Sequence, residues 1–350
     1  MKPRKFYVSI LIFFILIFFI FWLFNQLIPQ QSFAEAPAQK SIAVFVLDGT
    51  SASKITESNT PNLDKLSEKS LTAESFHPVI PSTTESHSTM YIAGDCGNPE
   101  KAQNCVDNSG IASLCDYARL HGMLCVMASE AGDFEQARKE FDIAFYDSGF
   151  FDFRIELNSF NEDTSLLKDF FEEWKNKEKN YNTEKKGIEK YALYSKYIVD
   201  VDNALIKFFE EKLNGKKFLL FSNIKGDDFC GHDFNDSAYS ECISLLDKDS
   251  SQLIQTILDS NELVAAFTAD HGMDFDCPEC KGHHTQPPYS LSPEVLNIPL
   301  IIYDGKDAGM IKENSNSFDL MPSLFYYAGL PDSCSRMRYC KGKILTPSFN

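Results

Sequence analysis

Basic residues are scarce in this chain. Its 350 residues include 33 lysines and arginines against 50 aspartates and glutamates, which gives a formal net charge of −17 at pH 7. No basic stripe is available to neutralise the phosphates of a nucleic-acid duplex, so a general nucleic-acid-binding protein is excluded. Phosphate chemistry is not excluded, because bound metal ions supply positive charge locally.

Internal repeats and low-complexity tracts are also absent from the sequence. The length suits one large α/β domain or two smaller ones. With 43% hydrophobic residues, the composition is that of a globular protein with an ample core.

One long apolar run is present, from Phe6 to Phe24, broken only by Ser9. At a rise of about 1.5 Å per residue, this run matches the ~30 Å hydrocarbon core of a bilayer. The basic flank in residues 1–5 is expected to stay in the cytoplasm, so the rest of the chain is exported. We interpret residues 6–24 as a transmembrane signal-anchor, followed by a linker over residues 25–40. A signal peptide cleaved near Ala34-Glu35-Ala36 is the alternative, and it would give a secreted protein.

Ten cysteines fit an exported protein in an oxidising compartment. Three pairs lie close together in the sequence, namely Cys96/Cys105, Cys277/Cys280 and Cys334/Cys340. The sequence does not determine how the cysteines pair. For Cys277-Pro-Glu-Cys280 a zinc or redox site stays open beside the favoured structural disulfide.

Residues 41–350 read as one domain in which apolar strands alternate with helices. Strands are expected at 41–47, 123–128, 141–146, 217–224, 263–267 and 298–303, and helices from Pro61 and at 84–93, 111–121, 191–213, 239–258 and 318–328. This alternation predicts an α/β fold with a doubly wound, mostly parallel sheet sandwiched by helices. Residues 150–190 are polar and charged, and we expect a helical insertion that is either a cap over the site or a surface excursion.

Side chains of the metal-ligating type follow the predicted strands. These are Asp48, Asp228 with His232, Asp270 with His271, and the neighbouring His283 and His284. In an open α/β sheet, ligands bind outside the carboxyl ends of the strands. Carboxylates and imidazoles at that edge suit divalent metals such as zinc, so the sequence predicts a site for two zinc ions.

A threonine at a predicted helix start completes this constellation. Thr84 stands in Pro81-Ser-Thr-Thr84, where free N–H groups and the helix dipole favour an anion. A threonine hydroxyl is a poor nucleophile until a metal or a base activates it. Thr83 is a neighbouring hydroxyl, but the spacing to Pro81 and Gly94 favours Thr84.

Together these pieces resemble the alkaline phosphatase superfamily, especially its type I phosphodiesterase/nucleotide pyrophosphatase branch. The resemblance extends from about Ser41 to Gly329 and is weakest over the insertion. The matching motifs stand in the family's order: Val46-Leu-Asp-Gly49, Pro81-Ser-Thr-Thr84 with Gly94, Asp228-x-x-Gly-His232, Thr268-Ala-Asp-His-Gly-Met273, His284, Asn297-Ile-Pro-Leu300 and Asp319-Leu-Met-Pro322.

The resemblance implies a role for each of these residues. One zinc ion would be held by Asp48, Thr84, Asp270 and His271, and the other by Asp228, His232 and His284, with His283 as the alternative to His284. Thr84 would be the nucleophile and would form a phospho-threonine that water then hydrolyses. His87 stands where the family usually has an asparagine that touches a phosphoryl oxygen. A histidine there either keeps that contact and adds a pH dependence or only packs.

The expected function is therefore that of a metal-dependent phosphoester hydrolase outside the cytoplasm, in the periplasm or the extracellular space. Its substrate would be a small-molecule phosphoester, such as a nucleotide or a phospholipid headgroup. The resemblance favours a diester over a monoester.

Three other functions are alternatives to this one. A transferase of phosphoethanolamine-type headgroups typically carries several membrane spans, whereas this chain has one. A non-catalytic binding protein on the same scaffold would be expected to have lost metal ligands. A sulfatase is disfavoured, because residues 82–86 lack the Pro and Arg of the Cys/Ser-x-Pro-x-Arg pattern.

Overall fold

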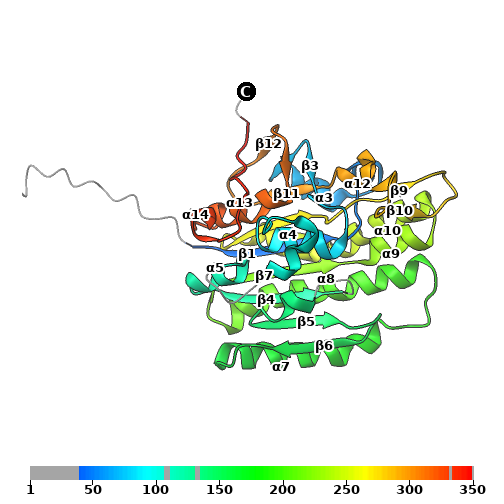
Figure 1. Ribbon diagram of the computed structural model, residues 1–350. Coiled ribbons are helices and arrows are strands. Elements are labelled where there is room, and N and C mark those ends of the chain that lie inside the picture. The colour runs from blue at the N-terminus through cyan, green and yellow to red at the C-terminus, as the bar shows by residue number, and fades with distance from the viewer. Residues whose placement is uncertain (1–38, 106–110, 131–134, 331–332, 349–350) are drawn as a thin grey trace, which may run out of the picture. The chain divides into compact units, whose positions relative to one another are not determined.

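A nine-stranded sheet forms the frame of the fold (Figure 1). The computed structural model describes residues 39–105, 111–130, 135–330 and 333–348. Across the sheet, the strands stand in the order β12 (Gly309–Ile311), β2 (Leu71–Ala73), β11 (Leu300–Tyr303), β8 (Leu263–Thr268), β1 (Ser41–Leu47), β7 (Phe218–Ile224), β4 (Leu124–Ser129), β5 (Ile143–Asp147) and β6 (Phe153–Leu157). Two small two-stranded sheets pair β3 (Phe76–His77) with β13 (Ser315–Asn316) and β9 (Asp274–Phe275) with β10 (Gly282–His283).

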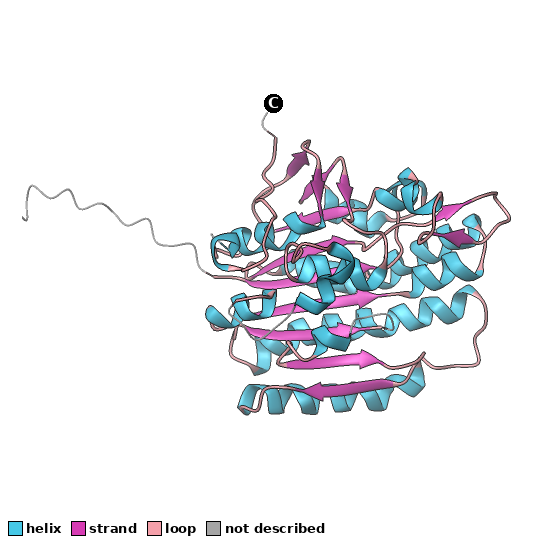
Figure 2. Cartoon of the chain, in the orientation of Figure 1, coloured by secondary structure: helices cyan, strands magenta, loops and turns pink. Residues whose placement is uncertain are grey.

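The five central strands β8, β1, β7, β4 and β5 run parallel to one another. Their neighbours β11 and β6 run antiparallel. All five parallel strands therefore end at the same edge, on the right in Figure 2. The expectation of an α/β fold with a large, mostly parallel sheet is confirmed.

Helices cover both faces of this sheet. The longer helices are α3 (Pro61–Ser67), α4 (Thr83–Tyr91), α5 (Leu114–Leu120), α7 (Glu162–Lys177), α8 (Ile188–Lys212), α9 (Gly226–Asp233), α10 (Asp236–Asp249), α11 (Ser251–Asp259) and α13 (Leu320–Tyr327). Short helices and 3-10 turns are α2 (Ala52–Glu57), η1 (Pro99–Cys105), α6 (Glu135–Arg138), η2 (Glu178–Asn180), η3 (Tyr289–Leu291), α12 (Pro293–Leu296), η4 (Ser317–Asp319) and α14 (Ser333–Arg336).

Strand β1 shows why the sheet is covered on both sides. All seven of its residues are buried, and successive side chains of a strand point to opposite faces. Val44 and Val46 pack in a cluster with residues of α4, α5 and α13. Phe45 and Leu47 pack in a second cluster with residues of α7, α8 and α11. A strand buried on both faces is expected to be apolar throughout, which is the pattern that the sequence shows.

The segment over residues 150–190 differs from the expected helical insertion. It contains α7, with Phe170, Phe171 and Trp174 on a buried face, but it also contains β6, which pairs with β5 at the end of the sheet. The sequence Phe-Arg-Ile-Glu-Leu of β6 alternates apolar and charged residues, as an edge strand does. Because α7 packs along β5 and β6, it covers a face of the sheet rather than its carboxyl edge.

A smaller difference concerns the predicted helix at 239–258. It is divided at Ser250 into α10 and α11, whose buried faces pack on different neighbours.

All ten cysteines are paired in disulfide bonds. The pairs are the three expected ones, Cys96–Cys105, Cys277–Cys280 and Cys334–Cys340, and two further ones, Cys115–Cys125 and Cys230–Cys242. Cys277 and Cys280 therefore form a structural bridge rather than a zinc site. The Cys230–Cys242 bond joins α9 to α10, and α9 carries two of the predicted metal ligands.

The predicted membrane segment, residues 6–24, lies outside the described residues, as does most of the linker. Among the residues that are described, none of the helices has the length and apolar character needed to cross a bilayer.

One buried carboxyl group stands apart from the metal-type residues. Asp202 on α8 is fully buried, and its Oδ2 accepts a hydrogen bond of 2.6 Å from the hydroxyl of Ser222 on β7. Its Oδ1 has no hydrogen-bond partner. Burial raises the pKa of Asp202 well above its ordinary value, because the charged form loses its water.

We expect Asp202→Asn to stabilise the protein increasingly as the pH rises. A raised pKa means that the folded protein holds a proton that the unfolded chain releases above about pH 4, so this group destabilises the fold as the pH rises. The amide of the variant does not titrate. Urea unfolding of both proteins should give similar free energies near pH 4 and a growing advantage of the variant toward pH 8. An advantage that does not change with pH would contradict this prediction.

Candidate metal centre

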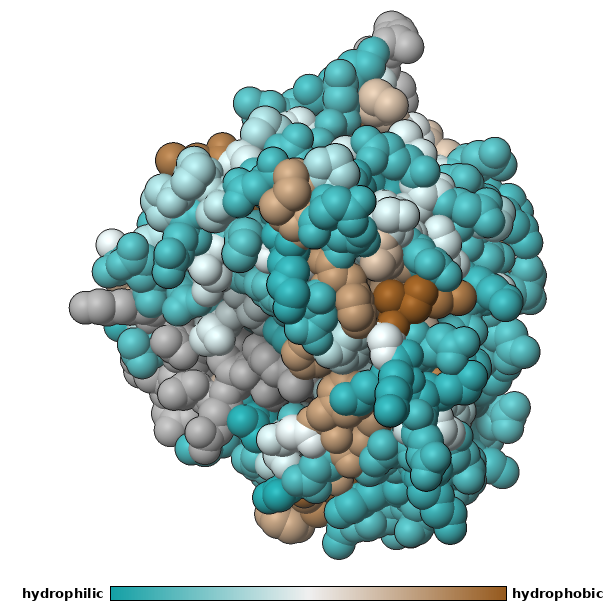
Figure 3. Space-filling view, turned by 90° about the vertical axis from the view of Figure 1, so that its right-hand side faces the viewer, coloured by the Kyte–Doolittle hydropathy of each residue, from teal (hydrophilic) through white to brown (hydrophobic). Residues whose placement is uncertain are grey.

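The carboxyl edge of the sheet gathers the predicted ligands. Asp48 directly follows β1, Asp228 lies in the first turn of α9 after β7, and Asp270 and His271 follow β8. These three strands are neighbours in the sheet, so segments that are far apart in sequence meet there. Figure 3 looks onto this edge, where a band of hydrophobic residues runs between hydrophilic regions.

Gly49 brings the loop after β1 close to α9. Its φ is +74°, which favours glycine, and a Cβ at this position would lie 2.9 Å from the Cα of Asp228. The backbone N–H of Gly49 donates a hydrogen bond of 3.0 Å to Oδ1 of Asp270. The hydroxyl of Tyr239 donates to the Gly49 carbonyl at 2.6 Å. Gly49 therefore holds the loop that carries Asp48 close to Asp228 and to Asp270.

A first group of ligands forms around Asp228. Its Oδ1 lies 3.3 Å from Nε2 of His232 and 4.0 Å from Nε2 of His284. The Nε2 atoms of the two histidines are 3.2 Å apart. Nδ1 of His284 donates to the carbonyl of Pro81 at 3.1 Å, which leaves Nε2 as the ligating atom.

The structure brings His284 into the cluster and leaves His283 outside it. His283 is exposed, and its ring lies 4.8 Å from the ring of Tyr289. His284 is 7% exposed, and its ring stacks on that of His271 with 3.6 Å between the centroids.

A second group lies on the other side of His271. Nε2 of His271 is 3.6 Å from Oδ1 of Asp48 and 3.4 Å from Oδ2 of Asp270. Its Nδ1 donates to the carbonyl of Gly272 at 3.0 Å. His271 therefore lies between the two groups.

The donor atoms fit divalent cations. Oδ1 of Asp48, Oδ1 of Asp228 and Oδ2 of Asp270 are buried without a hydrogen-bond partner, and such atoms cost free energy unless something binds them. Two sets of three donor atoms lie within 4.8 Å of one another, namely Asp228, His271 and His284, and Asp48, His87 and Asp270. Mixed nitrogen and oxygen donors of this kind suit zinc and similar metals. This grouping differs in part from the one that the resemblance implies. His271 groups with Asp228 and His284 and also lies close to Asp48 and Asp270, and His87 groups with Asp48 and Asp270.

Hydroxyl groups at the start of α4 lie beside this cluster. The helix begins at Thr83, one residue earlier than expected, and the Thr83 hydroxyl is 3.3 Å from Nε2 of His271. Thr84 is the next residue, and its carbonyl accepts a hydrogen bond from Ser88. The prediction of Thr84 as the nucleophile stays a prediction, and Thr83 is a neighbour that an experiment must separate from it.

Lys225 is a central residue that the sequence reasoning missed. Its Nζ lies 3.3 Å from Oδ2 of Asp48 and 3.2 Å from Oδ2 of Asp228, so it joins the carboxylates of the two expected metal sites. The side chain is only 12% exposed. Lysine is not a usual metal ligand, so a search by ligand type passes over it. Its place directly after a buried strand and three residues before Asp228 was the available signal.

Burial and charge set the protonation of the cluster. Burial lowers the pKa of His284 to about 3 and that of His87 to about 4, so both imidazoles are neutral at pH 7, as ligands must be. Burial and the charge of Asp48 raise the pKa of Asp270 to about 7. Burial would also raise the pKa of Asp228, but the Lys225 ammonium and the neighbouring His232 imidazole hold it below its ordinary value.

His87 lies deeper than the hydroxyls of α4. Its side chain is fully buried, and its ring packs edge-on against Phe221 of β7. Nε2 lies 3.9 Å from Oδ2 of Asp270, and neither ring nitrogen has a hydrogen-bond partner. The predicted contact of His87 with a phosphoryl oxygen stays a prediction.

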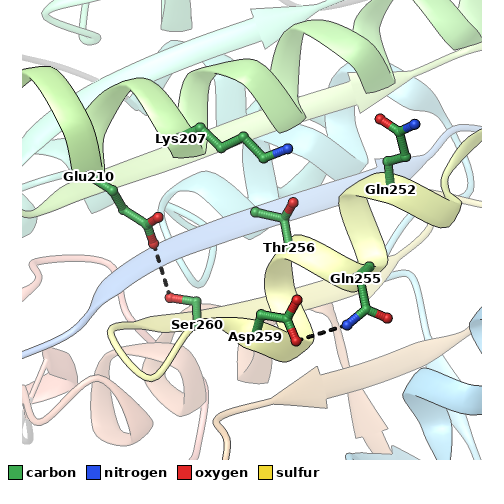
Figure 4. A pocket seen from close by; sticks show the side chains of 7 residues that line it. All are labelled: Lys207, Glu210, Gln252, Gln255, Thr256, Asp259 and Ser260. Carbon is green, nitrogen blue, oxygen red and sulfur yellow. Dashed lines mark hydrogen bonds between the residues drawn. The ribbon is translucent and has the colours of Figure 1, made fainter.

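A cavity elsewhere in the molecule lies between α8 and α11 and measures about 380 Å³ (Figure 4). Its lining residues are Lys207, Glu210, Gln252, Gln255, Thr256, Asp259 and Ser260. They belong to the ends of helices that lead into β7 and β8, at the amino edge of the sheet, opposite the metal-type cluster. Several of these side chains form hydrogen bonds with one another, such as the one of 2.8 Å that Gln255 donates to Asp259. We assign the cavity no role.

Solved structures with the same fold cover most of this chain. The PsFucS1 sulfatase from Pseudoalteromonas sp. matches with a TM-score of 0.57 and 16% identity, over 89% of this chain and 72% of that one. The lipoteichoic acid synthase LtaP from Listeria monocytogenes gives 0.58 and 17%, over 87% and 75%. The phosphonate monoester hydrolase SpPMH from Silicibacter pomeroyi gives 0.55 and 13%, over 87% and 76%. At these identities the likeness shows the fold alone.

A sequence relative and a family model add to this. The 2,3-bisphosphoglycerate-independent phosphoglycerate mutase of Coxiella burnetii is 30% identical over 132 residues, which are 38% of this chain and only 24% of the mutase. The family model described as "Metalloenzyme superfamily" matches residues 40–318, most of the described domain. The resemblance to the alkaline phosphatase superfamily is thereby confirmed, and the chain belongs to the Metalloenzyme superfamily.

Proposed function

We propose that this protein is a metal-dependent phosphoester hydrolase that acts through a covalent phospho-threonine at Thr84. One observation carries the proposal. Three buried carboxylates with unpartnered oxygens meet a set of imidazoles at the carboxyl edge of the sheet, beside a helix start that bears hydroxyl groups. This is the donor set and the position that metal-assisted phosphoryl chemistry requires.

Two divalent metals, which we propose to be zinc, would be held at this edge. Asp48, Thr84, Asp270 and His271 would hold one, and Asp228, His232 and His284 the other. When bound, such ions polarise phosphoryl oxygens and lower the pKa of a coordinated hydroxyl or water. The mixed histidine and aspartate donors support zinc over magnesium or calcium, which prefer oxygen ligands alone.

The protein's own groups would carry the reaction in two steps. The hydroxyl of Thr84 gives its proton to solvent, and its oxygen attacks phosphorus and forms a Thr–O–P bond while the bond from phosphorus to the leaving-group oxygen breaks. Water then attacks phosphorus and breaks the Thr–O–P bond. This releases a phosphate monoester from a diester substrate, or phosphate from a monoester, and the threonine oxygen regains a proton. The free N–H groups at the start of α4 and the Lys225 ammonium, which lies 3.3 Å from Asp48, would stabilise the negative charge of the transition state.

For the substrate we propose a small-molecule phosphodiester outside the cytoplasm, such as a nucleotide or a lipid headgroup. The predicted anchor at residues 6–24 and the five disulfides support an exported enzyme. Transfer of a headgroup to an acceptor alcohol is the alternative within the superfamily. An assay with and without an alcohol acceptor separates the two, because a hydrolase turns over in water alone, whereas a transferase depends on the acceptor for turnover.

Replacement of the two threonines tests the nucleophile. With the zinc-loaded full-length protein and bis-p-nitrophenyl phosphate or p-nitrophenyl phosphate, we expect Thr84→Ala to lower kcat by more than about 1,000-fold, since a nucleophile is lost. The matched control Thr83→Ala should keep kcat within about tenfold. With p-nitrophenyl phosphate as substrate, mass spectrometry of the acid-quenched wild-type enzyme should find phosphate on Thr84.

Other outcomes of this comparison are equally clear. A large loss in Thr83→Ala with an active Thr84→Ala would move the nucleophile to Thr83. Full activity in both variants would end the covalent threonine mechanism. If the metal-loaded wild type cleaves neither ester, the protein is a binding protein on a hydrolase scaffold.

Removal of the buried ammonium tests the role of Lys225. Lys225→Met keeps the length of the side chain and removes its charge, so we expect kcat/KM to fall by roughly 10- to 100-fold through weaker transition-state stabilisation. The number of bound metals should not change. Lys185→Met removes an exposed lysine that pairs with Glu189 on the surface, and it should act as wild type. An unchanged kcat/KM in Lys225→Met would show that the ammonium only balances charge in the metal-free protein.

A further inference from the structure

We propose that His87 is a ligand of the metal that Asp48 and Asp270 hold, rather than a contact to the phosphoryl group. The proposal is based on the fully buried imidazole of His87, which lies beside the buried carboxylates of Asp48 and Asp270. Each of the three side chains has a polar atom without a hydrogen-bond partner. The inference rests on the proposed function only for the presence of bound metals and does not depend on hydrolysis.

The distances suit one shared ion. The donor atoms of Asp48, His87 and Asp270 lie within 4.8 Å of one another, and Nε2 of His87 is 3.9 Å from Oδ2 of Asp270. Two ligands at zinc distances of about 2.1 Å stand roughly 3.4 Å apart in a tetrahedral shell. Nε2 of His87 and Oδ2 of Asp270 are about 0.5 Å farther apart than this, and no two donors are more than about 1.4 Å farther apart. Rotations about the side-chain torsions would therefore bring the three donors onto a single ion.

The hydrogen-bond inventory favours a ligand over a packing role. A neutral imidazole carries one N–H donor and one lone pair, and burying both unpaired is costly. In the same chain, both ring nitrogens of His77 have partners, Ser75 at 2.7 Å and the carbonyl of Leu296 at 2.6 Å. His87 has none, and Oδ1 of Asp48 and Oδ2 of Asp270 have none either. One cation would satisfy a nitrogen and two oxygens together.

The depth of the ring argues against a direct contact with substrate. His87 stands on α4 one turn beyond Thr84, and its side chain is 0% exposed, whereas Thr83 and Thr84 are partly exposed. A phosphoryl group that approaches the helix start meets the threonines first. The imidazole lies beneath them, against Phe221 of the sheet, on the side of the two carboxylates.

Cobalt binding to the full-length protein tests this inference without any turnover. Metal-free wild type, His87→Asn and His121→Ala are titrated with Co²⁺ in competition with a chelator, and the visible absorption of the bound ion is recorded. Asparagine is the residue that the family usually has here, and it is a poor ligand for this ion. His121 is an exposed imidazole at the end of α5 and serves as the matched control.

We expect His87→Asn to weaken one of the two Co²⁺ sites by at least tenfold and to change the absorption spectrum, since a nitrogen ligand is lost. His121→Ala should match wild type. X-ray absorption of the zinc-loaded wild type gives a second reading that needs no variant. It should find four imidazoles shared by two zinc ions, namely His87, His232, His271 and His284, and a fit with three would contradict the inference.

Wild-type affinity and spectrum in a folded His87→Asn would overturn the proposal. Weaker competitive inhibition by inorganic phosphate in that variant would then make His87 a phosphoryl contact, and unchanged inhibition would make it a packing residue. A wild type that binds two Co²⁺ ions through His87 but cleaves no ester would leave this inference standing and end the hydrolase proposal. A wild type that binds no Co²⁺ would end both.

Discussion

The burial of three like charges at one edge of the sheet is the constraint on which the site depends. Asp48, Asp228 and Asp270 are all nearly inaccessible to water, and their loops are held together by backbone contacts such as the one from Gly49. Isolated buried carboxylates are costly, and carboxylates that share a small volume repel one another. The fold tolerates them only because cationic or neutral donors surround them, and the ammonium of Lys225 contacts two of them. Divalent metals would neutralise more of the negative charge of these carboxylates than one ammonium does. The donor set is therefore better understood as a metal centre than as a salt-bridge network.

The rest of the structure holds this edge in place. Parallel strands in the order β8, β1, β7 set the spacing of the three loops, and two hydrophobic clusters hold the sheet between its helices. A disulfide bond joins α9 to α10, and Tyr239 of α10 donates a hydrogen bond to the Gly49 carbonyl in the loop after β1. The helix that carries Asp228 and His232 is therefore connected to the loop that carries Asp48. Ligands held in this way lose little conformational entropy when they bind an ion, which is the physical basis of a preorganised site.

Much of this arrangement could be predicted from the sequence, because its strongest signals are local. Apolar runs such as 218–224 are buried on both faces and have few alternatives to a central strand. Other features depend on three-dimensional context. Strand β6 was missed because Arg154 and Glu156 gave its segment a polar composition. Lys225 was missed because its role comes from two carboxylates, one of them 177 residues away in sequence. The depth of His87 depends on how α4 is rotated against the sheet, which its short and weakly amphipathic sequence does not specify.

The central claim is that two metal ions occupy the carboxyl edge, and anomalous diffraction from zinc-loaded crystals tests it most directly. The account predicts two peaks about 4 Å apart, the usual spacing of paired catalytic metals. One peak should lie against Asp48 and Asp270 and the other against Asp228, His232 and His284. Absence of both peaks from zinc-loaded crystals would contradict the account.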